Sequence, residues 1–454
     1  MKHALQANRR QFLKTSAATA ASLAVLNPSA WVAAAEQKSE VFRFAQIGCG
    51  GKGDSDLSSV ESGGAKLVAM CDVDSNRAKG AFQKHASLPK YTDYRKMLDE
   101  MENEIDGVVV STPDHTHAVA ATDAIRRGMH AYVQKPLART YDECQVLHDA
   151  AIKHGVVTQM GNQGHAGSGL KLWQAMMDAD AFGEIKEVHC WSDRPIWAQG
   201  MTSYPGKKEI PSTLDWNAWQ GPVARRDFGN GIVPFAWRGW WEYGCGAMGD
   251  MACHNMDPAF WILHLGMPSK VVAKASAPAT IAYPEWSVIE FTFPATDVYP
   301  HEIKLFWHDG KKMPPSPEGY TINSGNGCMV MGSKLTAMGG SHASPPKVIA
   351  VEGSTNAEAV AQAQQHWSEV HKTLRGSNHY HDWVNAAKAH DPSATETKFS
   401  YAAPMTQAIL VGCVALRFPE QTLEFDAASA RFSNSAEASE WLRFKPLNGY
   451  DLKF

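Results

Sequence analysis

Several patterns that mark common classes of protein are missing from this sequence. The formal net charge is only -4 over 454 residues, and no block of lysine and arginine is present. Nucleic-acid surfaces and polybasic membrane patches both need clustered basic residues, so neither kind of partner is expected. No repeat of fixed period and no low-complexity tract occurs. With 44% hydrophobic and 20% charged residues, the composition is that of an ordinary globular protein. Because the net charge is low and no basic block is present, we expect small neutral or weakly charged ligands.

Cysteine is present, but without the spacing of a metal or redox centre. The eight cysteines are scattered, and none forms a C-x-x-C pair. We interpret them as mostly buried apolar residues, with Cys49 and Cys71 at the ends of expected strands. A disulfide framework is therefore not predicted.

Long apolar runs are missing too, and the short one near the N-terminus resembles part of an export signal. Arg9-Arg10-Gln11-Phe12-Leu13-Lys14 precedes a mild apolar run from Ala17 to Leu26, and Ala33-Ala34-Ala35 follows. Roughly ten apolar residues are too few to span a bilayer. A basic head, a short apolar stretch and small residues before a cleavage site are what a targeting segment needs.

Residues 1–35 therefore resemble a twin-arginine signal peptide. Asn8 departs from the Ser or Thr usual at that position, and an amphipathic first helix is the alternative interpretation. We expect passage through the twin-arginine translocation machinery, a mature chain that begins near Glu36 and has no membrane span, and a periplasmic or otherwise exported location. Because this route carries folded proteins, a cofactor would be acquired in the cytoplasm.

After a polar linker, the chain alternates between strand-like and helix-like segments. An expected strand at 41–47 leads into the turn Gly48-Cys-Gly-Gly-Lys-Gly53, a helix to Glu61 and a second strand at 66–71. Further strands are expected at 105–110, 130–133 and 156–159, and helices at 118–127 and 140–154. This alternation predicts a parallel sheet covered by helices on both faces.

Gly48, Gly50 and Gly53 form a G-x-G-x-x-G pattern in the context that a dinucleotide-binding turn requires. The pattern follows a strand, opens a helix, and is followed 19 residues past Gly53 by Asp72 at the end of the next strand. The helix N-terminus would then meet the pyrophosphate. Asp72 can accept hydrogen bonds from the adenosine ribose, which favours NAD over NADP, although Arg77 nearby leaves NADP open. A Rossmann-like domain that binds no dinucleotide is the alternative.

Beyond Gly161 the pattern changes to strands in a mostly antiparallel arrangement. Strand-like runs occupy 184–191, 270–275, 287–293, 302–307 and 327–338; helices are expected at 169–179, 377–389 and 405–416, and loops at 311–326 and 339–346. The predicted fold class is α/β: a doubly wound parallel Rossmann sheet over 36–160, then an α+β substrate and oligomerisation domain over 161–454 with a large open sheet. Since such a sheet often forms a subunit interface, we expect a homo-oligomer, either a dimer or a tetramer.

Three further segments bring a family resemblance. Ser111-Thr-Pro-Asp-His-Thr-His117, Gln134-Lys135-Pro136 and Gly249-Asp250-Met-Ala-Cys-His254, together with the glycine turn, resemble the Gfo/Idh/MocA family of glucose-fructose oxidoreductases, inositol dehydrogenases and relatives. The resemblance covers most of the mature chain. It implies that Lys135, Asp250 and His254 face the nicotinamide.

The resemblance also suggests which residues hold the cofactor. The expected set is Gly48, Gly50, Gly51, Gly53, Asp72, Thr112, Pro113, His115, His117 and Lys135. Gln134 stands where the family has Glu, which should alter how Lys135 is held more than what it does.

The chemistry of these residue types supports the same assignment. Oxidation of a secondary alcohol by NAD needs a base for the hydroxyl proton, and a histidine such as His254 suits that transfer. Lys135 ends a strand at the carboxyl edge of the sheet, where it can donate to the reacting oxygen. Asp250 lies one helical turn before His254, so it can orient Lys135 or bind an adjacent hydroxyl.

Other interpretations of these residues stay open at this point. Asp250 could be a helix N-cap, and Pro258 could begin a second short helix. The pairs His115-x-His117 and Asp250-x-x-x-His254 could hold a metal, but no coherent third ligand accompanies either pair, so no metal site is predicted.

Aromatic residues point to the substrate. Seven of the 15 tryptophans fall between Trp191 and Trp241, and indole faces stack on the apolar faces of sugar rings. The candidate substrate-binding residues are Trp197 and Trp241, with His165, Arg194 and Asn255 as hydrogen-bonding groups. For most of the tryptophans, packing is the competing explanation.

Three functions follow from these observations. The leading one is an exported NAD(P)-dependent oxidoreductase that acts on a CH-OH or keto position of a sugar, glycoside or cyclitol and recycles a tightly bound cofactor. The second, a reaction of a subset of the resembled family, is NAD-dependent glycoside hydrolysis or elimination through transient oxidation at C3, with Tyr204, Tyr243 or His165 as candidates for an additional base. The third is a non-catalytic sugar-binding protein that retains the fold.

Overall fold

A computed structural model of the chain describes residues 41–277, 280–353 and 357–454. The expected signal peptide at 1–35 lies outside these ranges. Within them, no helix is both long enough and apolar enough to cross a membrane.

The first part of the described chain forms a six-stranded parallel sheet in the order β3-β2-β1-β4-β5-β6. Its elements are β1 (Arg43–Ile47), α3 (Lys52–Ser62), β2 (Lys66–Cys71), α4 (Lys79–Lys84), β3 (Lys90–Tyr91), α5 (Tyr94–Met101), η1 (Glu102–Glu104), β4 (Gly107–Val110), α6 (Asp114–Ile125), β5 (His130–Val133), α7 (Tyr141–His154) and β6 (Thr158–Met160). This order is that of a doubly wound dinucleotide-binding sheet, so the predicted fold class is confirmed for this region. The sequence analysis did not identify α4, β3 or α5, which are all short.

Local sequence explains why these elements begin and end where they do. The central strand β4 is a run of valines, Val108–Val110, that is fully buried, as expected for a parallel strand covered on both faces. Helix α7 begins with a capping box, in which Thr140 accepts from the Glu143 backbone N–H while the Glu143 side chain accepts from the Thr140 N–H. It ends at Gly155, whose φ of 61° is a left-handed conformation that favours glycine.

The second part of the chain forms a nine-stranded sheet in the order β13-β12-β11-β7-β10-β9-β8-β14-β15. Its strands are β7 (Ile185–Trp191), β8 (Lys270–Ala275), β9 (Ser287–Phe293), β10 (Ile303–His308), β11 (Gly327–Gly332), β12 (Leu335–Gly339), β13 (Lys347–Val351), β14 (Thr422–Asp426) and β15 (Arg431–Phe432). Strand β10 pairs with β7 in parallel, and the other described pairs are antiparallel. The predicted large, mostly antiparallel sheet is therefore confirmed, and the glycine-rich run at 327–338 is two strands.

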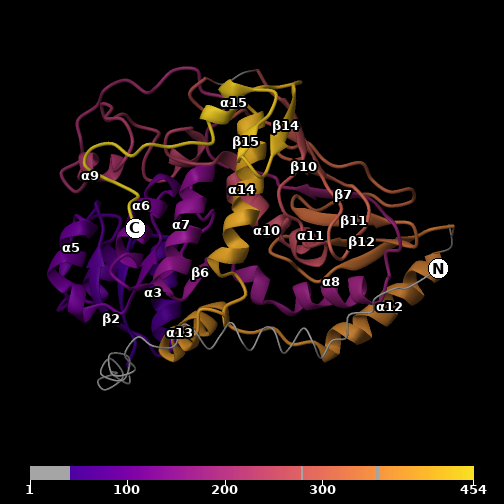
Figure 1. The fold of residues 1–454 in the computed structure, drawn as a ribbon, viewed down its shortest axis with the longest axis horizontal. Coiled ribbons are helices and arrows are strands. Elements are labelled where there is room, and N and C mark those ends of the chain that lie inside the picture. The colour runs from indigo at the N-terminus through magenta and orange to yellow at the C-terminus, as the bar shows by residue number, and fades with distance from the viewer. Residues whose placement is uncertain (1–40, 278–279, 354–356) are drawn as a thin grey trace, which may run out of the picture. The chain divides into compact units, whose positions relative to one another are not determined.

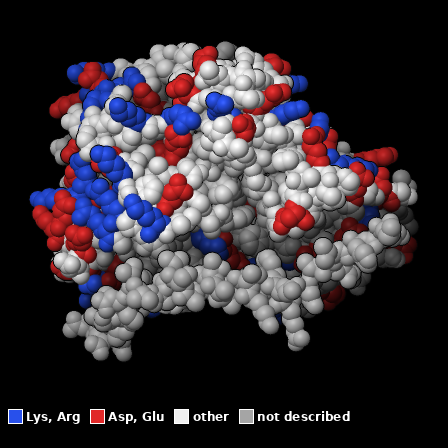
Figure 2. All heavy atoms as spheres, viewed as in Figure 1, with Lys and Arg blue, Asp and Glu red and all other residues white. Residues whose placement is uncertain are grey.

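The helices of this part are η2 (Gln163–Ala166), α8 (Ser168–Asp178), α9 (Trp216–Gln220), η3 (Ala236–Gly239), α10 (Gly246–Asn255), α11 (Asp257–Ile262), α12 (Ala357–Thr373), α13 (His379–Ala389), α14 (Phe399–Ala415) and α15 (Ala436–Glu440). Figure 1 shows α8, α11 and α12 near the second sheet, whereas α9 and α13 lie on the side of the Rossmann elements. Charged side chains of both signs are mixed over the face drawn in Figure 2.

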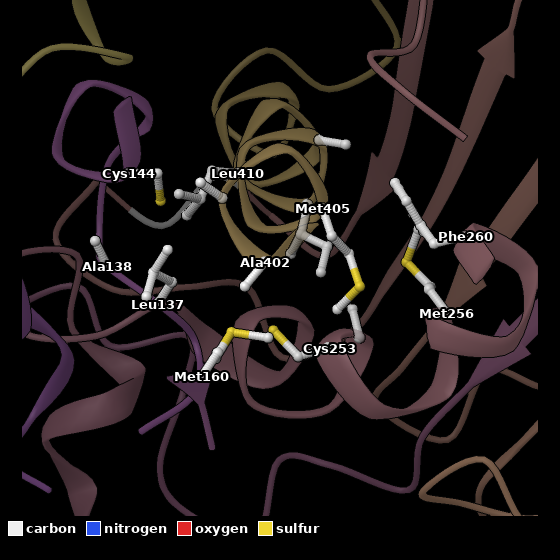
Figure 3. Packing of buried hydrophobic residues seen from close by; sticks show 14 of the residues in the cluster. Leu137, Ala138, Cys144, Met160, Cys253, Met256, Phe260, Ala402, Met405 and Leu410 are labelled. Carbon is white, nitrogen blue, oxygen red and sulfur yellow. The ribbon is translucent and has the colours of Figure 1, made fainter. Parts of the chain in front are cut away.

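Helix α14 is the buried helix that joins the packing of the two sheets. It starts earlier than the predicted 405–416, because the chain stays helical through Pro404. Figure 3 shows Met405 on the side that faces Met160 of β6 and Cys253 of α10, while Leu410 faces Cys144 of α7. The same core therefore contacts the last Rossmann strand and the helix that carries Asp250.

The segment around Asp250 is two helices rather than one. Pro258 lies in the first turn of α11, as the alternative interpretation predicted. Cys245 is the N-cap of α10, so Asp250 lies within the helix. The N-cap interpretation of Asp250 was therefore wrong.

Helix α13 belongs to the packing of the Rossmann sheet, although it lies far along the chain. Asn378 caps its N-terminus by accepting from two backbone N–H groups. Trp383 and Val384 of α13 pack in one buried cluster with Phe44 of β1 and Leu57 of α3. A segment near the C-terminus thus completes the core beneath the glycine turn.

Candidate functional site

A cavity of about 530 Å³ lies where the parallel strands end, between the glycine turn and α10. Carboxyl ends of parallel strands meet at one edge of a sheet, which is where ligands bind in such folds. Of the predicted site residues, Gly48, Gly50, Asp72, Thr112, Pro113, Lys135, Arg194, Trp197, Asp250 and His254 line this cavity. We call it the glycine-turn cavity.

The glycine turn has room only for glycine. Gly48 has a φ of +84°, and a Cβ there would lie 2.6 Å from the carbonyl oxygen of Ser111. A Cβ at Gly53 would overlap the carbonyl oxygen of Gly48, because α3 packs directly on the turn. The Arg77 side chain lies against Gly50 and Gly51, which places a guanidinium beside the turn.

Asp72 is tied to the same turn. One carboxylate oxygen accepts from the backbone N–H of Cys49 at 2.7 Å, and the other accepts from that of Asp74 at 2.9 Å. Burial raises the pKa of Asp72. A carboxylate has more acceptor positions than these two bonds use, so Asp72 can still accept from ribose hydroxyls. The glycine turn, the start of α3 and Asp72 together fit the adenosine and pyrophosphate half of a dinucleotide.

Gln134 takes part in a buried network that connects the turn to the lysine strand. Its Nε2 donates to Asp56 Oδ2 at 2.9 Å, and its Oε1 accepts from the backbone N–H of Lys135 at 3.3 Å. Asp56 also accepts from the hydroxyls of Ser111 at 2.8 Å and Tyr380 at 2.7 Å. The amide that replaces the family's carboxylate therefore faces a buried carboxylate.

Lys135 and Asp250 form an ion pair on the cavity wall. Lys135 Nζ lies 2.8 Å from Asp250 Oδ1 and donates to the Asp250 carbonyl oxygen at 3.0 Å. Arg238 Nε lies 3.3 Å from Oδ1, and Arg194 Nε lies 3.6 Å from Oδ2. Burial alone would raise the pKa of Asp250, but Lys135 and Arg238 hold it well below its ordinary value. Asp250 is therefore a fixed negative charge rather than a proton donor.

Arg238 is a site residue that the sequence analysis missed. It bridges Asp250 and Asp114, lying 2.9 Å from both carboxylate oxygens of Asp114. It comes from η3 in a long irregular segment, and its guanidinium lies 4.3 Å from the centre of the Trp237 ring. A single arginine among tryptophans carries no local signal that it will reach a residue 124 positions earlier.

The hydrogen bonds of His254 define which of its nitrogens is free. Asn162 Nδ2 donates to the Cys253 carbonyl oxygen at 2.8 Å, so Asn162 Oδ1 is an acceptor and takes the proton of His254 Nδ1 at 2.7 Å. His254 Nε2 then carries a lone pair, because the hydrogen bond to Asn162 takes the proton of Nδ1. Burial, and after it the charge of Lys135, hold the pKa of His254 well below its ordinary value. His254 is thus a neutral imidazole with an available acceptor nitrogen.

His342 is a second imidazole at the same wall, and sequence reasoning gave it no role. Its ring stacks on that of His254 with ring centres 3.9 Å apart. Ser341 donates its hydroxyl to Asn255 Oδ1 at 2.9 Å and lies 2.7 Å from His342 Nδ1. The hydroxyl must therefore accept from Nδ1, which leaves His342 Nε2 as an acceptor. Burial, followed by the charge of Lys135, lowers the pKa of His342.

Both histidines of the predicted cofactor loop are buried, and their ring nitrogens contact backbone carbonyl oxygens. His115 contacts the carbonyl oxygens of Tyr243 and Trp219, and burial lowers its pKa to about 3. His117 contacts those of Pro136 and Thr112. They connect the loop to neighbouring segments and are not among the described residues that line the cavity.

Three of the candidate substrate-binding residues lie elsewhere as well. His165 is fully buried and bonds Asp257 at 3.0 Å. Asn255 donates to the Trp191 carbonyl oxygen at 2.7 Å and, through Ser341, holds the loop of His342. Trp241 lines a separate cavity.

The two remaining candidates for an additional base are also away from the cavity wall. Tyr204 stacks on Trp240 with ring centres 4.9 Å apart, and the Arg226 guanidinium lies 3.4 Å from its ring centre. Tyr243 is fully buried beside Trp219. Among the residues that the structure describes, no three His, Cys, Asp or Glu side chains are grouped to hold a metal ion.

This arrangement, a dinucleotide cradle facing a lysine, a carboxylate and a histidine, defines an oxidoreductase of the Rossmann class. Residues 42–162 match the NAD-binding Rossmann domain of the GFO_IDH_MocA oxidoreductase family, and residues 184–297 match the C-terminal alpha/beta domain of that family. The two matches cover more than half of the chain. The chain belongs to the Gfo/Idh/MocA oxidoreductase family, and its Rossmann domain binds NAD. Residues 6–25 match a twin-arginine signal sequence, which supports export.

Curated relatives with different activities are similar to this chain. The inositol 2-dehydrogenase of Salmonella typhimurium (strain LT2) is 28% identical over 153 residues, or 33% of this chain and 44% of the relative. The alpha-N-acetylgalactosaminidase of Shewanella oneidensis is 33% identical over 170 residues, or 32% of this chain and 37% of the relative. These matches span less than half of the relatives' own length.

Solved structures share the fold over nearly their whole length. The WlbA dehydrogenase from Bordetella pertussis, in complex with NADH and UDP-GlcNAcA, has a TM-score of 0.57 and 17% identity, covering 86% of this chain and 99% of that one. An inositol dehydrogenase homolog from Azotobacter vinelandii, complexed with NADH and myo-inositol, has a TM-score of 0.53 and 15% identity, covering 85% and 98%. The architecture is therefore common to this group of NADH-binding structures.

Proposed function

We propose that the protein is an exported enzyme that oxidises or reduces a CH-OH or keto position of a sugar, glycoside or cyclitol, and that it works in the periplasm with a tightly bound NAD. The observation that carries this proposal is the Lys135–Asp250 ion pair together with His254, whose Nδ1 is held by Asn162, in the cavity that also contains the glycine turn. The curated inositol 2-dehydrogenases and the NADH complexes with sugar-like ligands support the substrate class.

Each residue has a separate task in this reaction. His254 Nε2 takes the hydroxyl proton, because the imidazole is neutral and its other nitrogen, Nδ1, is held by Asn162. Lys135 donates to the same oxygen and stabilises its developing negative charge. Asp250 holds the ammonium of Lys135 in place and balances its charge. When bound, NAD supplies the acceptor for the hydride that leaves the carbon.

The remaining cavity residues suit a polyol. Arg194 and Trp197 line the same cavity, so a guanidinium and an indole are available for hydroxyls and for the apolar face of a ring. Trp197 Nε1 donates to Gln199 Oε1 at 3.0 Å, which fixes the indole. Thr112 and Pro113 lie at the end of β4, where they would contact the cofactor.

The proposal is tested on the purified exported protein by measuring bound dinucleotide and turnover. We expect NAD to copurify, detected by mass spectrometry, and its absorbance to change when a panel of sugars, glycosides, cyclitols and 3-keto glycosides is added. Lys135→Met should abolish the change, whereas Lys171→Met, at a partly exposed lysine that pairs with Glu396 outside the cavity, should not. Protein without dinucleotide and without affinity for it would refute the proposal, and bound NAD without any turnover would favour a sugar-binding protein.

A second function has an observation of its own. Glycoside cleavage through transient oxidation at C3 needs another base to take the C2 proton, and His342 offers an acceptor Nε2 beside His254. Because a ketone at C3 acidifies the C2 proton, a neutral imidazole is a competent base for its removal. The Shewanella alpha-N-acetylgalactosaminidase shows that the chain also resembles glycoside-cleaving proteins.

The two functions differ in what His342 contributes. If the chain cleaves glycosides, His342→Ala should stop release of free sugar but leave the change in cofactor absorbance on adding glycoside. If the chain is a simple oxidoreductase, no free sugar appears and turnover changes the redox state of a second substrate.

A further inference from the structure

A second cavity, separate from the glycine-turn cavity, lies between α14, the start of α7 and the C-terminal segment after α15. Its volume is about 290 Å³. Three arginines line it: Arg139 after β5, Arg417 after α14, and Arg443 in the C-terminal segment. We call it the arginine cavity. In Figure 2, basic side chains are visible near the position that Figure 1 gives to α15.

Arg417 is held in position without an acidic partner. Its guanidinium lies 3.9 Å from the centre of the Trp241 ring and 3.5 Å from that of Trp441, so the two indoles enclose its faces. Among the residues that the structure describes, none accepts a hydrogen bond from this guanidinium or pairs with it. Burial lowers the pKa of Arg417 to about 10, which leaves it charged at neutral pH. The N–H donors of Arg417 lie in the plane of the guanidinium, so the indoles that contact its faces do not use them.

Two of the other charged residues at this cavity, Arg443 and Glu242, have charged partners. Arg443 lies 3.4 Å from Asp142, and Glu242 lies 2.7 Å from Arg226. Arg139 donates to the Trp241 carbonyl oxygen at 3.2 Å, and its buried Nε has no hydrogen-bond partner among the described residues. Burial raises the pKa of the nearby Glu143 carboxyl, and the charge of Arg139 opposes that rise. Among the described residues, Arg417 and Arg139 therefore form no ion pair with a carboxylate.

The rest of the cavity wall is apolar. Leu410 and Val414 of α14, Tyr283, Phe444 and Leu447 contribute hydrocarbon and aromatic surface. An inorganic anion would fill only a small part of the volume, and the apolar walls would not replace the hydrogen bonds it makes to water. A planar carboxylate matches the fork of a guanidinium, and an apolar body attached to it would occupy the remaining space.

We propose that the arginine cavity binds a small organic monocarboxylate, whose carboxylate accepts from Arg417 and whose apolar body packs against α14 and the C-terminal segment. A charge held between two indoles and left unpaired in a partly buried cavity is an unusual state, because unpaired buried charges are normally neutralised or balanced. The site is independent of the redox activity proposed above, since none of the residues named here lines the glycine-turn cavity.

Calorimetric titration of the full-length protein, as purified, tests the proposal. The probes are benzoate and cyclohexanecarboxylate, with benzamide as the uncharged analogue and inorganic phosphate as the bare anion. We expect both carboxylates to bind, and benzamide and phosphate to bind at least about tenfold more weakly, because each lacks either the charge or the apolar body.

Two variants locate the site. Arg417→Met keeps an unbranched side chain between the indoles and should weaken benzoate at least about tenfold, since the charge-assisted hydrogen bonds are lost. Leu447→Trp fills the cavity from its exposed rim and leaves the arginine intact, so it should weaken benzoate even if the first variant does not fold. Arg375→Gln, an exposed arginine that contacts only backbone carbonyls, is the matched control and should bind as the parent does.

Each other outcome overturns the proposal. No binding of either carboxylate to the parent protein would show that the cavity is not a carboxylate site. Benzoate affinity unchanged in both cavity variants would place the binding elsewhere. Phosphate that binds more tightly than benzoate would show an anion site of a different class.

Discussion

Removing the charge of Asp250 is the most direct test of the cavity's electrostatics. Asp250→Asn keeps the size of the side chain and its carbonyl oxygen but removes the negative charge that faces Lys135, Arg238 and Arg194. These three cations would then face one another, although Arg238 retains the carboxylate of Asp114 and Arg194 retains that of Asp193. We expect lower stability and weaker catalysis from the same change.

The magnitude follows from burial. The Asp250 side chain is 12% exposed and that of Lys135 is 15% exposed, so solvent screens their interaction only slightly. Breaking a buried ion pair by removing one partner costs about 3–5 kcal/mol. Because Arg238 keeps its bonds to Asp114 and Arg194 is partly exposed, we expect the lower end, about 3 kcal/mol in the free energy of unfolding.

Chemical denaturation at equal cofactor content measures this loss. Glu369→Gln is the matched control, because Glu369 pairs with Lys372 at 2.6 Å while both side chains remain more than half exposed. That variant should stay within about 0.5 kcal/mol of the parent. An Asp250→Asn protein that unfolds with the parent's free energy would refute the buried ion network.

The pH dependence of this difference has a definite sign. The folded protein holds the pKa of Asp250 below its ordinary value of 3.8. A carboxylate with a lowered pKa contributes stability that is fully present above the ordinary value and is lost as the pH falls through the folded pKa. The parent and Asp250→Asn should therefore differ by the same amount at pH 7 and at about pH 5. A difference that grows as the pH falls between these two values would show that the folded pKa of Asp250 is raised rather than lowered.

Three further predictions concern the turn and the base. His254→Gln should reduce turnover by about 10²–10⁴-fold with bound NAD retained, as measured by steady-state assay and mass spectrometry of the same sample. Gly53→Ala should lose bound NAD, because the added Cβ overlaps a backbone carbonyl; NAD bound at the parent's level would contradict the packing of α3. Asp72→Ala should weaken NAD by about 1.5–3 kcal/mol and NADP by less, in titrations of cofactor-free protein; equal losses would show that Asp72 does not contact the ribose.

The sequence predicted those parts of the site whose geometry is set by neighbours along the chain. The strand before Gly48 and the helix after it place the turn, and both follow from hydrophobic periodicity. The family resemblance singled out Lys135, Asp250 and His254, and the position of Lys135 just after a buried strand and the one-turn spacing of Asp250 and His254 supported it. In each case a short spacing in the sequence is also a short distance in the fold.

The residues that were missed reach the cavity from distant, irregular segments. Arg238 comes from η3 and His342 from the loop after β12, and neither position has a periodic pattern. Asn162 fixes the protonation of His254 from 92 positions away. Such contacts depend on how the two sheets pack, which local propensity does not encode.

For the tryptophan-rich segment, the sequence suggested more ligand-binding residues than the structure provides. Its density pointed to a sugar-binding surface, yet Trp216, Trp219 and Trp240 pack together with Tyr243 in one buried cluster. Trp197 lines the glycine-turn cavity, and Trp241 encloses Arg417. Composition therefore located an aromatic region, but only tertiary contacts separate its packing residues from those that can meet a ligand.

The departure at Gln134 is explained by its partner rather than by its position in the motif. A carboxylate at this position would face Asp56, which is fully buried, pairs with Lys52 at 2.7 Å and already accepts from Ser111 and Tyr380. Two ionised carboxylates this close repel each other, so the pKa of one of them would rise and that group would tend to hold a proton. The amide removes this conflict, because Nε2 donates to Asp56 while Oε1 still accepts from the Lys135 N–H. Gln134 thus preserves the hold on the lysine strand that the motif provides, and it does so with a neutral group because a charge already lies beside it.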